Sequence, residues 1–317
     1  DIQVRAGGST GLEINQTMTS DSSGILYVAW QDRNLTYDYI QIYSSSDGGA
    51  TWSAYGYVSN SSAHLKEPSM AVGEGSQPTL LVAYIVDDGV NIPCPEVATT
   101  PLGSFSFTIH SVPWLNFWEG YAKPVIFTDS VHWSGWFAYL TCEGIYEAAT
   151  DNINVCFWRS LDYGASWQYA STGGPGVIGE SDDFAWRDAD GSYGTTLERV
   201  FLATYNDDDN TLYMVASDDF GDTIPSTQTA INTLPYDPIH PVNPDIEAAV
   251  NHDNVMLVCT HDHSIDGQDD DDIGQTYSTD AGNTWPNPLW NLEGSTNTNE
   301  FAPELTANEG GDSWHAA

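Results

Sequence analysis

The chain has 317 residues, of which 40% are hydrophobic and 12% aromatic, so it can bury a substantial core. Its 45 acidic residues against 7 basic ones give a formal net charge of −38 at pH 7, which disfavours nucleic acid and anionic membranes as partners. No apolar run is long enough to cross a bilayer, so membrane insertion is not expected.

A short phrase with the pattern Ser-x-Asp-x-Gly-x-Ser/Thr-Trp recurs at residues 45–52, 160–167, 217–224 and 278–285, the third copy ending in Ile224. The first serines lie 115, 57 and 61 residues apart. A unit of about 57 residues therefore repeats, which indicates an array of similar supersecondary units. The missing copy corresponds to residues 99–105, where Pro101 replaces the aspartate and Phe105 stands near the tryptophan position.

Each residue type in the phrase suits a tight turn. The serine and aspartate can hydrogen-bond to the turn backbone, the glycine accepts a positive φ, and the tryptophan anchors the turn to the residues beneath it. The phrase therefore predicts a hairpin turn and not a catalytic motif. The predicted turn residues are Ser45, Asp47, Gly49, Trp52, Ser160, Asp162, Gly164, Trp167, Ser217, Asp219, Gly221, Ser278, Asp280, Gly282 and Trp285.

Two further markers repeat with the turns. Short apolar runs at residues 26–29, 80–83, 137–138, 200–203, 256–258 and 314–317 predict one strand in each unit, entering a polar loop. Before several of these runs lies an X-Pro step, which we interpret as the start of a preceding strand, because a strand start needs no N–H there. These steps are Glu67-Pro68, Lys123-Pro124, Asn243-Pro244 and Ala302-Pro303. These markers together predict four antiparallel strands in each unit.

Four antiparallel strands per repeat form the blade of a β-propeller, so the predicted fold is an all-β propeller. The repeated phrases resemble the Asp-box, or BNR, repeats of the sialidase-like propeller superfamily, and the resemblance covers nearly the whole chain. Five complete units are followed by part of a sixth, and residues 1–5 resemble a lone outer strand. We expect residues 1–317 to form a single propeller domain with six blades, the last one incomplete, from a longer secreted protein.

Export and cysteine pairing are linked expectations. Glycosylation sequons at Asn15, Asn34 and Asn60 fit an extracellular or cell-surface protein. Cys142 and Cys156 fall on adjacent strands of the third unit, which predicts a cross-strand disulfide. Cys94 and Cys259 belong to separate units and are expected to be unpaired, and the alternative is four buried thiols.

Acidic residues concentrate in the loops after the apolar strands. We call the face of the propeller where these loops emerge the upper face, and we expect it to be strongly negative. The candidate Ca²⁺ ligands are Asp207, Asp208, Asp209, Asp269, Asp270, Asp271 and Asp272. The alternative is a set of solvated acidic loops. His261 and His263 lie two apart, so both imidazoles could bind a transition metal, or each could simply form hydrogen bonds.

Evidence for catalysis is weaker in the sequence. Residues 24–33 resemble a sialidase strand that ends in a carboxylate and an arginine, which makes Asp32 and Arg33 weak catalytic candidates. The resemblance implies a cluster of three arginines, yet only Arg33 clearly falls on the upper face, with Arg187 as a second candidate. Without such a cluster, a carboxylate sugar would be repelled by an acidic face.

A glycosidase acting on neutral sugars needs only two suitably separated carboxylates, which this face can provide. Trp114, Phe117, Trp118 and Tyr121 could stack on sugar rings, or they could form the core between blades. The sequence favours a non-catalytic binding or structural module that is supported by Ca²⁺ and takes a glycan or protein ligand at its acidic face. The alternative is a glycoside hydrolase of the sialidase-like superfamily, either an exo-sialidase or a neutral-sugar glycosidase.

Overall fold

The computed structural model describes most of the chain, and every regular element in the described part is a β-strand. No helix long and apolar enough to span a membrane occurs in that part. The described residues are 12–33, 37–74, 76–113, 120–129, 136–147, 152–170, 177–178, 186–194, 199–206, 211–225, 229–231, 242–248, 254–262, 271–285, 290–291, 305–307 and 314–316.

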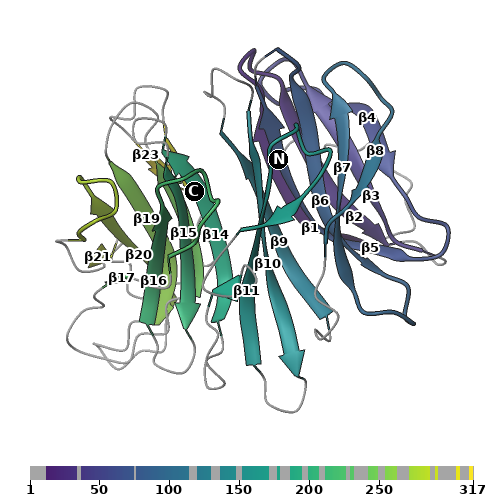
Figure 1. Cartoon of the computed structure of the whole chain (residues 1–317). Coiled ribbons are helices and arrows are strands. Elements are labelled where there is room, and N and C mark those ends of the chain that lie inside the picture. The colour runs from purple at the N-terminus through teal and green to yellow at the C-terminus, as the bar shows by residue number, and fades with distance from the viewer. Residues whose placement is uncertain are drawn as a thin grey trace. The chain divides into compact units, whose positions relative to one another are not determined.

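The first two repeats each fold as one antiparallel sheet whose four strands follow chain order (Figure 1). This order confirms the four-stranded unit predicted from the sequence. The first sheet contains β1 (Leu12–Ser20), β2 (Leu26–Arg33), β3 (Tyr39–Ser45) and β4 (Ser53–Val58). The second contains β5 (His64–Gly73), β6 (Thr79–Asp87), β7 (Cys94–Pro101) and β8 (Thr108–Ser111).

The later repeats follow the same plan. The third sheet contains β9 (Gly120–Thr128), β10 (Ala138–Glu147), β11 (Asn152–Ser160) and β12 (Gln168–Tyr169), and β13 (Val177–Ile178) also pairs with β11. The fourth contains β14 (Trp186–Gly194), β15 (Arg199–Asn206), β16 (Thr211–Ser217) and β17 (Thr229–Ile231). The fifth contains β18 (Val242–Ala248), β19 (Val255–Asp262), β20 (Asp271–Ser278) and β21 (Trp290–Asn291). A two-stranded sheet of β22 (Leu305–Ala307) and β23 (Trp314–Ala316) follows. Repeated four-stranded antiparallel sheets of this kind are typical of β-propeller blades.

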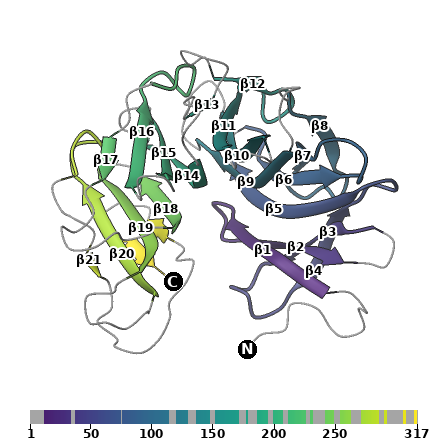
Figure 2. The same ribbon diagram turned by 90° about the horizontal axis from the view of Figure 1, so that it is seen from below.

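The chain divides into two compact units, each described here by itself. Unit 1 comprises Asp1–Gly144 and Trp158–Gln168, and unit 2 comprises Ile145–Phe157 and Tyr169–Ala317. In unit 1 the first two sheets pack face to face, and Figure 2 shows them side by side. Their strands alternate between the two faces of each sheet, so every second residue of β2 and β6 enters this core. The residues include Tyr27, Ala29, Ile40, Leu80, Val82 and Tyr84.

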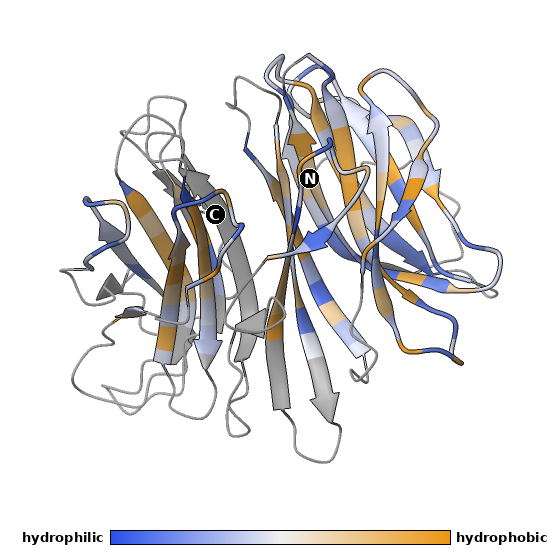
Figure 3. Cartoon of the chain, viewed as in Figure 1, coloured by the Kyte–Doolittle hydropathy of each residue, from blue (hydrophilic) through white to orange (hydrophobic). Residues whose placement is uncertain are grey.

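Unit 2 has an equivalent core between its fourth and fifth sheets. Its members again come mainly from the inner strands, and they include Phe201, Ala203, Tyr205, Met214, Leu257 and Trp285. Figure 3 shows hydrophobic residues concentrated along the described strands and hydrophilic ones in the turns. Burial of apolar side chains between sheets is therefore what stabilises each unit.

The four recurrent phrases form the predicted hairpin turns. In the first, the Ser45 hydroxyl donates to Asp47 Oδ1 (2.8 Å) and accepts from the Gly49 N–H (2.9 Å). Asp47 Oδ1 also accepts from the Thr51 N–H at 2.8 Å. The same three bonds recur from Ser160, Ser217 and Ser278 and their aspartates, within 0.1 Å of these lengths. The predicted turn is therefore confirmed at all four places.

Glycine is required in these turns for two reasons. Gly164 and Gly282 have φ values of 80° and 74°, a conformation that side chains disfavour. A Cβ on Gly164 would lie 2.8 Å from Leu81 of the preceding sheet, and one on Gly282 would lie 2.8 Å from Met214. Each of these turns therefore packs its backbone directly on the neighbouring sheet, where a side chain would have to displace Leu81 or Met214.

The degenerate copy at residues 99–105 is also a turn, joining β7 to β8. Gly103 has φ of 82°, and its N–H donates to the Tyr55 hydroxyl at 3.2 Å. Phe105 is 69% exposed, however, whereas Trp167 at the matching place in the third sheet is 6% exposed. The hairpin therefore forms without the aspartate, but its aromatic residue does not anchor it as the tryptophans do.

Replacing Asp162 with alanine is expected to destabilise the protein by roughly 1–3 kcal/mol at neutral pH, because hydrogen bonds to a charged group are lost. Burial raises the pKa of Asp162, but hydrogen bonds from Ser166 and Ser160 outweigh that effect and lower it overall. The carboxylate's contribution is therefore complete above its ordinary pKa and is lost as the pH falls through the lowered value. Urea unfolding of wild type and variant at several pH values should show a deficit that shrinks in acid.

Ser166→Ala is the matched control, because it removes only the hydroxyl bond to Asp162 Oδ2 and leaves the backbone bond to Oδ1. A deficit smaller than that of Asp162→Ala is expected. Equal deficits, or one that does not change between neutral and acid pH, would contradict this account of the turn.

The X-Pro steps are not strand starts, which corrects the prediction. Glu67-Pro68 lies inside β5, where the pairing with β6 shifts register between Lys66 and Ser69. Lys123-Pro124 lies inside β9, and the shift in β18 spans Asn243-Pro244. Each shift is a β-bulge, which leaves a residue outside the ladder, so the missing proline N–H removes no bond. Ala302-Pro303 falls outside the described residues.

An unusual backbone conformation recurs in the first strand of each of the first three sheets. Asn15, Glu67 and Lys123 have φ of 52°, 52° and 46°, respectively, at corresponding places in β1, β5 and β9. Positive φ is uncommon for residues with side chains, and a following proline further restricts Glu67 and Lys123. Bulges re-aim the side chains around them, and these three lie at one end of unit 1.

The predicted Cys142–Cys156 disulfide is wrong, because all four cysteines are thiols. Both residues are buried in the middle strands of the third sheet. Burial raises the pKa of the Cys156 thiol well above its ordinary range, and it raises that of Cys259 to about 12. Since the thiolate is the form that reacts, these cysteines behave as small apolar side chains.

A thiol titration is expected to distinguish the two states. In denaturant without reductant, four thiols should react per chain, as the structure has four cysteine thiols. In native buffer, Cys156 and Cys259 should react far more slowly because both are buried. A count of only two reactive thiols in denaturant would instead support the Cys142–Cys156 disulfide.

Candidate functional site

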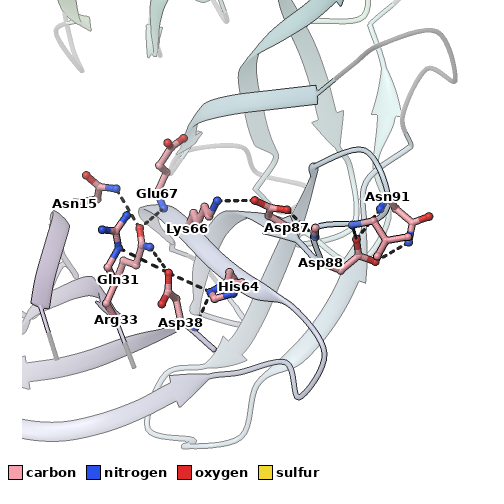
Figure 4. Close-up of polar contacts among 12 residues, drawn as sticks. Asn15, Gln31, Arg33, Asp38, His64, Lys66, Glu67, Asp87, Asp88 and Asn91 are labelled. Atoms are coloured by element: carbon pink, nitrogen blue, oxygen red, sulfur yellow. Dashed lines mark hydrogen bonds and ion pairs between the residues drawn. The ribbon is translucent and has the colours of Figure 1, made fainter. Parts of the chain in front are cut away.

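The ends of the strands opposite the aspartate turns carry a cluster of polar side chains in unit 1. β2 ends at Arg33 and β6 at Asp87, whereas β3 reaches its turn at Ser45, at the other end of the sheet. We call this cluster the bulge edge, because the bulges of the first strands lie within it (Figure 4). Its members are Asn15, Gln31, Arg33, Asp38, His64, Lys66, Glu67, Asp87, Lys123 and Glu143.

Side chains connect the three positive-φ positions of β1, β5 and β9. Gln31, only 1% exposed, accepts through Oε1 from Asn15 Nδ2 (3.2 Å) and from the Glu67 N–H (3.4 Å). Glu67 Oε2 in turn accepts from the Lys123 N–H at 2.7 Å. The amide of Gln31 and the carboxylate of Glu67 therefore hold β1, β5 and β9 in a fixed relation at this edge.

Asp38 anchors the part of the edge around the first sheet. Its buried carboxylate accepts from Gln31 Nε2 at 2.8 Å and lies 3.9 Å from Arg33 Nε. His64 Nδ1 lies 3.4 Å from the same carboxylate and accepts from the Asp38 N–H at 3.3 Å. The Tyr37 ring packs edge-on against His64, with centroids 5.7 Å apart. One buried carboxylate thus positions an arginine and a histidine whose side chains stay about half exposed.

The two lysines of the chain both lie at this edge, each against a carboxylate. Lys66 Nζ is 2.5 Å from Asp87 Oδ2, and Lys123 Nζ is 3.1 Å from Glu143 Oε1. The pKa of Asp87 is lowered first by the Lys66 hydrogen bond and then by the Gly89 N–H. Asp87 is therefore ionised at neutral pH, which is the state that a nucleophile or general base needs.

Asp88, beside Asp87, has a local structural role. Its Oδ1 accepts from the N–H groups of Val90 (2.9 Å) and Asn91 (2.7 Å), and Asn91 Nδ2 donates to its Oδ2. The pKa of Asp88 is lowered, first by the Asn91 backbone bond. This carboxylate orders the loop between β6 and β7 (Figure 4).

The weak catalytic candidates Asp32 and Arg33 are not brought together. Successive residues in a strand point to opposite faces. Asp32 is 3% exposed and accepts from the Tyr39 hydroxyl at 2.9 Å, whereas Arg33 is directed towards Asp38. Arg33 therefore belongs to the bulge edge, and Asp32 is held by the neighbouring strand β3.

The arginines in the described residues do not form a sialidase-type cluster. Arg199 binds Asp218 and donates to Ala281 O at 2.8 Å, which places it at the turn end of unit 2. Arg159 directly precedes the Ser160 turn in β11. Of the arginine side chains that the structure describes, Arg33 is the one at the bulge edge.

The predicted metal ligands are largely untested. Asp207, Asp208, Asp209, Asp269, Asp270 and His263 lie outside the described residues. His261 pairs with Asp272 and Asp262 with Asp271 across β19 and β20, so the last two aspartates begin a strand and are not in a loop. Among the described residues, no three or more His, Cys, Asp or Glu form a metal-binding group. Calcium and transition-metal binding stay predictions.

The aromatic group before the third sheet is described only at Tyr121. This residue is 3% exposed, and its ring lies 5.9 Å from that of Trp158. Tyr121 is therefore a core residue and not a sugar-stacking platform. Trp114, Phe117 and Trp118 fall outside the described residues.

The sequence did not reveal most members of the edge, namely Asn15, Gln31, Asp38, His64, Lys66, Glu67 and Lys123. Glu67 and Lys123 did carry a signal, since each precedes one of the repeated prolines. A polar residue before a proline within an apolar strand indicates a bulge, and bulges occur often beside active sites. Gln31 had no such signal, because its role depends on contacts with distant strands.

No protein-family model and no curated protein sequence match this chain. Solved structures do match its fold. A protein of unknown function from Dyadobacter fermentans aligns over 94% of this chain and 88% of its own, with 14% identity and a TM-score of 0.62. The Penicillium chrysogenum α-L-arabinanase in complex with arabinobiose aligns over 95% and 87%, with 12% identity and a TM-score of 0.59.

A PL25 ulvan lyase aligns over 95% of this chain and 74% of its own, with 8% identity and a TM-score of 0.55. At these identities the likeness shows the fold alone. It extends over nearly the whole chain in all three cases, and two of the three structures are of glycan-active enzymes.

Proposed function

We propose that this chain is a glycan-active enzyme that cleaves a polysaccharide at the bulge edge. The observation that carries this proposal is Glu67, a partly exposed carboxylate on a strained bulge residue with φ of 52°. Its N–H is bound by Gln31, and its Oε2 by the Lys123 N–H. Strained residues held by their surroundings cluster at active sites, where the strain serves preorganisation.

The neighbouring charges supply a second group. Glycoside hydrolysis uses two carboxyl groups, one handling the proton of the leaving oxygen and the other acting as nucleophile or base. Glu67 takes the first role, since the Lys123 N–H fixes one of its carboxyl oxygens and the partly exposed group is accessible to a bound glycan. Asp87 takes the second, because Lys66 keeps it ionised. The fold shared with an arabinanase and an ulvan lyase supports this over the non-catalytic module favoured by the sequence.

The turns and the repeat support a wider assignment. Four aspartate turns with the same hydrogen bonds support membership of the Asp-box, sialidase-like superfamily. The repeat period, and the two strands that follow the fifth sheet, support six blades. Within that superfamily we favour a glycosidase other than a sialidase, and we propose that the protein acts outside the cell with a glycan as partner.

The test is a cleavage assay on a panel of plant, algal and microbial polysaccharides. New reducing ends without an unsaturated product are expected, which identifies hydrolysis. Ultraviolet absorbance of an unsaturated uronate would instead identify a lyase and would contradict the two-carboxylate mechanism. Binding without any cleavage would contradict the proposal and favour a binding module.

A further inference from the structure

We infer that the glycan bound at the bulge edge is electrically neutral, an inference that rests on the proposed function and specifies its substrate class. The chain has 7 basic residues, and three of them, Arg33, Lys66 and Lys123, lie at this edge. A cluster of cations in so acidic a protein would at first suggest an anionic ligand. The contacts of the three cations show otherwise.

Each cation is already neutralised by a carboxylate of the protein. Arg33 faces Asp38 at 3.9 Å, Lys66 faces Asp87 at 2.5 Å, and Lys123 faces Glu143 at 3.1 Å. The side chains of Asp38 and Glu143 are 7% and 8% exposed, whereas those of Arg33 and Lys123 are 52% and 51% exposed. The buried carboxylates are therefore fixed partners that an incoming anion would not displace.

The remaining charge is negative. Glu67 adds a carboxylate with backbone partners only in the described contacts, and the whole chain carries −38. A uronate or sulfate group would meet neutralised cations, the Glu67 carboxylate and a repulsive field. Its binding would therefore be penalised.

A neutral sugar fits the same groups. Each sugar hydroxyl both donates and accepts, and each ion pair presents a donor beside an acceptor. The amide of Asn15, which is exposed, adds a further donor and acceptor at the same edge. Tyr37, 37% exposed against His64, offers a ring face to the apolar side of a sugar.

The experiment measures binding of a neutral arabinan or galactan and of polygalacturonate to the full wild-type chain, at low temperature and short times, so that cleavage does not interfere and the Glu67 charge is kept. Salt is varied from about 10 mM to about 1 M, over which the Debye length falls from about 30 Å to about 3 Å. We expect the neutral polymer to bind with little salt dependence, and polygalacturonate to bind weakly at low salt. Tighter binding of polygalacturonate at low salt that is lost at high salt would overturn the inference.

Tyr37→Ala should weaken binding of the neutral polymer about fivefold, as expected for the loss of one ring contact. Tyr277→Ala, at a tyrosine of β20 in unit 2 that is 47% exposed, should leave it unchanged. Neutral binding without cleavage by wild type would refute the proposed activity while upholding the ligand class. Cleavage of polygalacturonate would uphold the proposed activity and refute the neutral ligand class. Binding of neither polymer would overturn both.

Discussion

Gly73→Ala is expected to destabilise the protein by more than about 3 kcal/mol, at the upper end of what overpacking costs. A Cβ at this position would lie 2.3–2.4 Å from three atoms of the Trp136 indole. The ring cannot move aside, because it is 1% exposed and packs edge-on against Tyr163 with centroids 5.2 Å apart. Its Nε1 also donates to Gln77 O at 3.4 Å. Urea unfolding monitored by tryptophan fluorescence measures the change.

Gly120→Ala is the matched control. Gly120 begins β9 in the same unit, and a Cβ there would meet Pro93 at 3.6 Å, an ordinary contact. Its φ is not positive, so alanine adds no backbone strain. We expect a change of less than about 1 kcal/mol, since surface and strand substitutions without a named mechanism stay small. Similar losses in the two variants would show that Trp136 does not pack on Gly73 as described.

The turns and middle strands could be predicted because their information is local. Ser45, Asp47 and Gly49 are all within one turn and bind one another, so the phrase alone defines the geometry. The apolar runs also identify β2, β6, β10, β15, β19 and β23, since short apolar runs bounded by polar turn residues are typical of strands. Repetition then extends one local observation to the whole chain.

The bulge edge could not be predicted in the same way. Gln31 binds Asn15, Asp38 and the backbone of Glu67, residues 16, 7 and 36 positions away. The contact with Glu67 depends on how the first two sheets are placed, and no pattern within one repeat records that. The prolines were visible in the sequence, but a strand start and a bulge both tolerate a missing N–H, so the pattern alone did not distinguish them.

The acidic face illustrates a further limit. Composition gave the net charge, but it could not show that both lysines and Arg33 lie at the same edge, each against a carboxylate. The disulfide prediction had a similar weakness. Adjacent strands bring two cysteines near one another. Whether they form a disulfide depends on the pairing register and on the face of the sheet to which each side chain points, which strand assignments do not give.

Glu67→Gln is expected to lower the rate of polysaccharide cleavage about 10³-fold, within the range that a general acid or base contributes. The amide has the shape of the carboxyl and can still accept from the Lys123 N–H, so the bulge should persist and stability should change little. It cannot transfer a proton, so the chemical step should slow while substrate binding is retained. Initial rates and binding isotherms on the polysaccharide that wild type cleaves measure the two effects separately.

Glu74→Gln is the control, because Glu74 is close to Glu67 in the sequence but lies at the turn end of the sheet. Glu74 follows β5 and accepts from the Ser22 N–H at 2.7 Å and from its hydroxyl at 3.1 Å, within the turn end of unit 1. Because that end lies away from the bulge edge, activity should stay at the wild-type level. Asp87→Asn should resemble Glu67→Gln, since it removes the ionised partner. Full activity in Glu67→Gln would remove this residue from the mechanism, and an equal loss in Glu74→Gln would attribute both effects to folding.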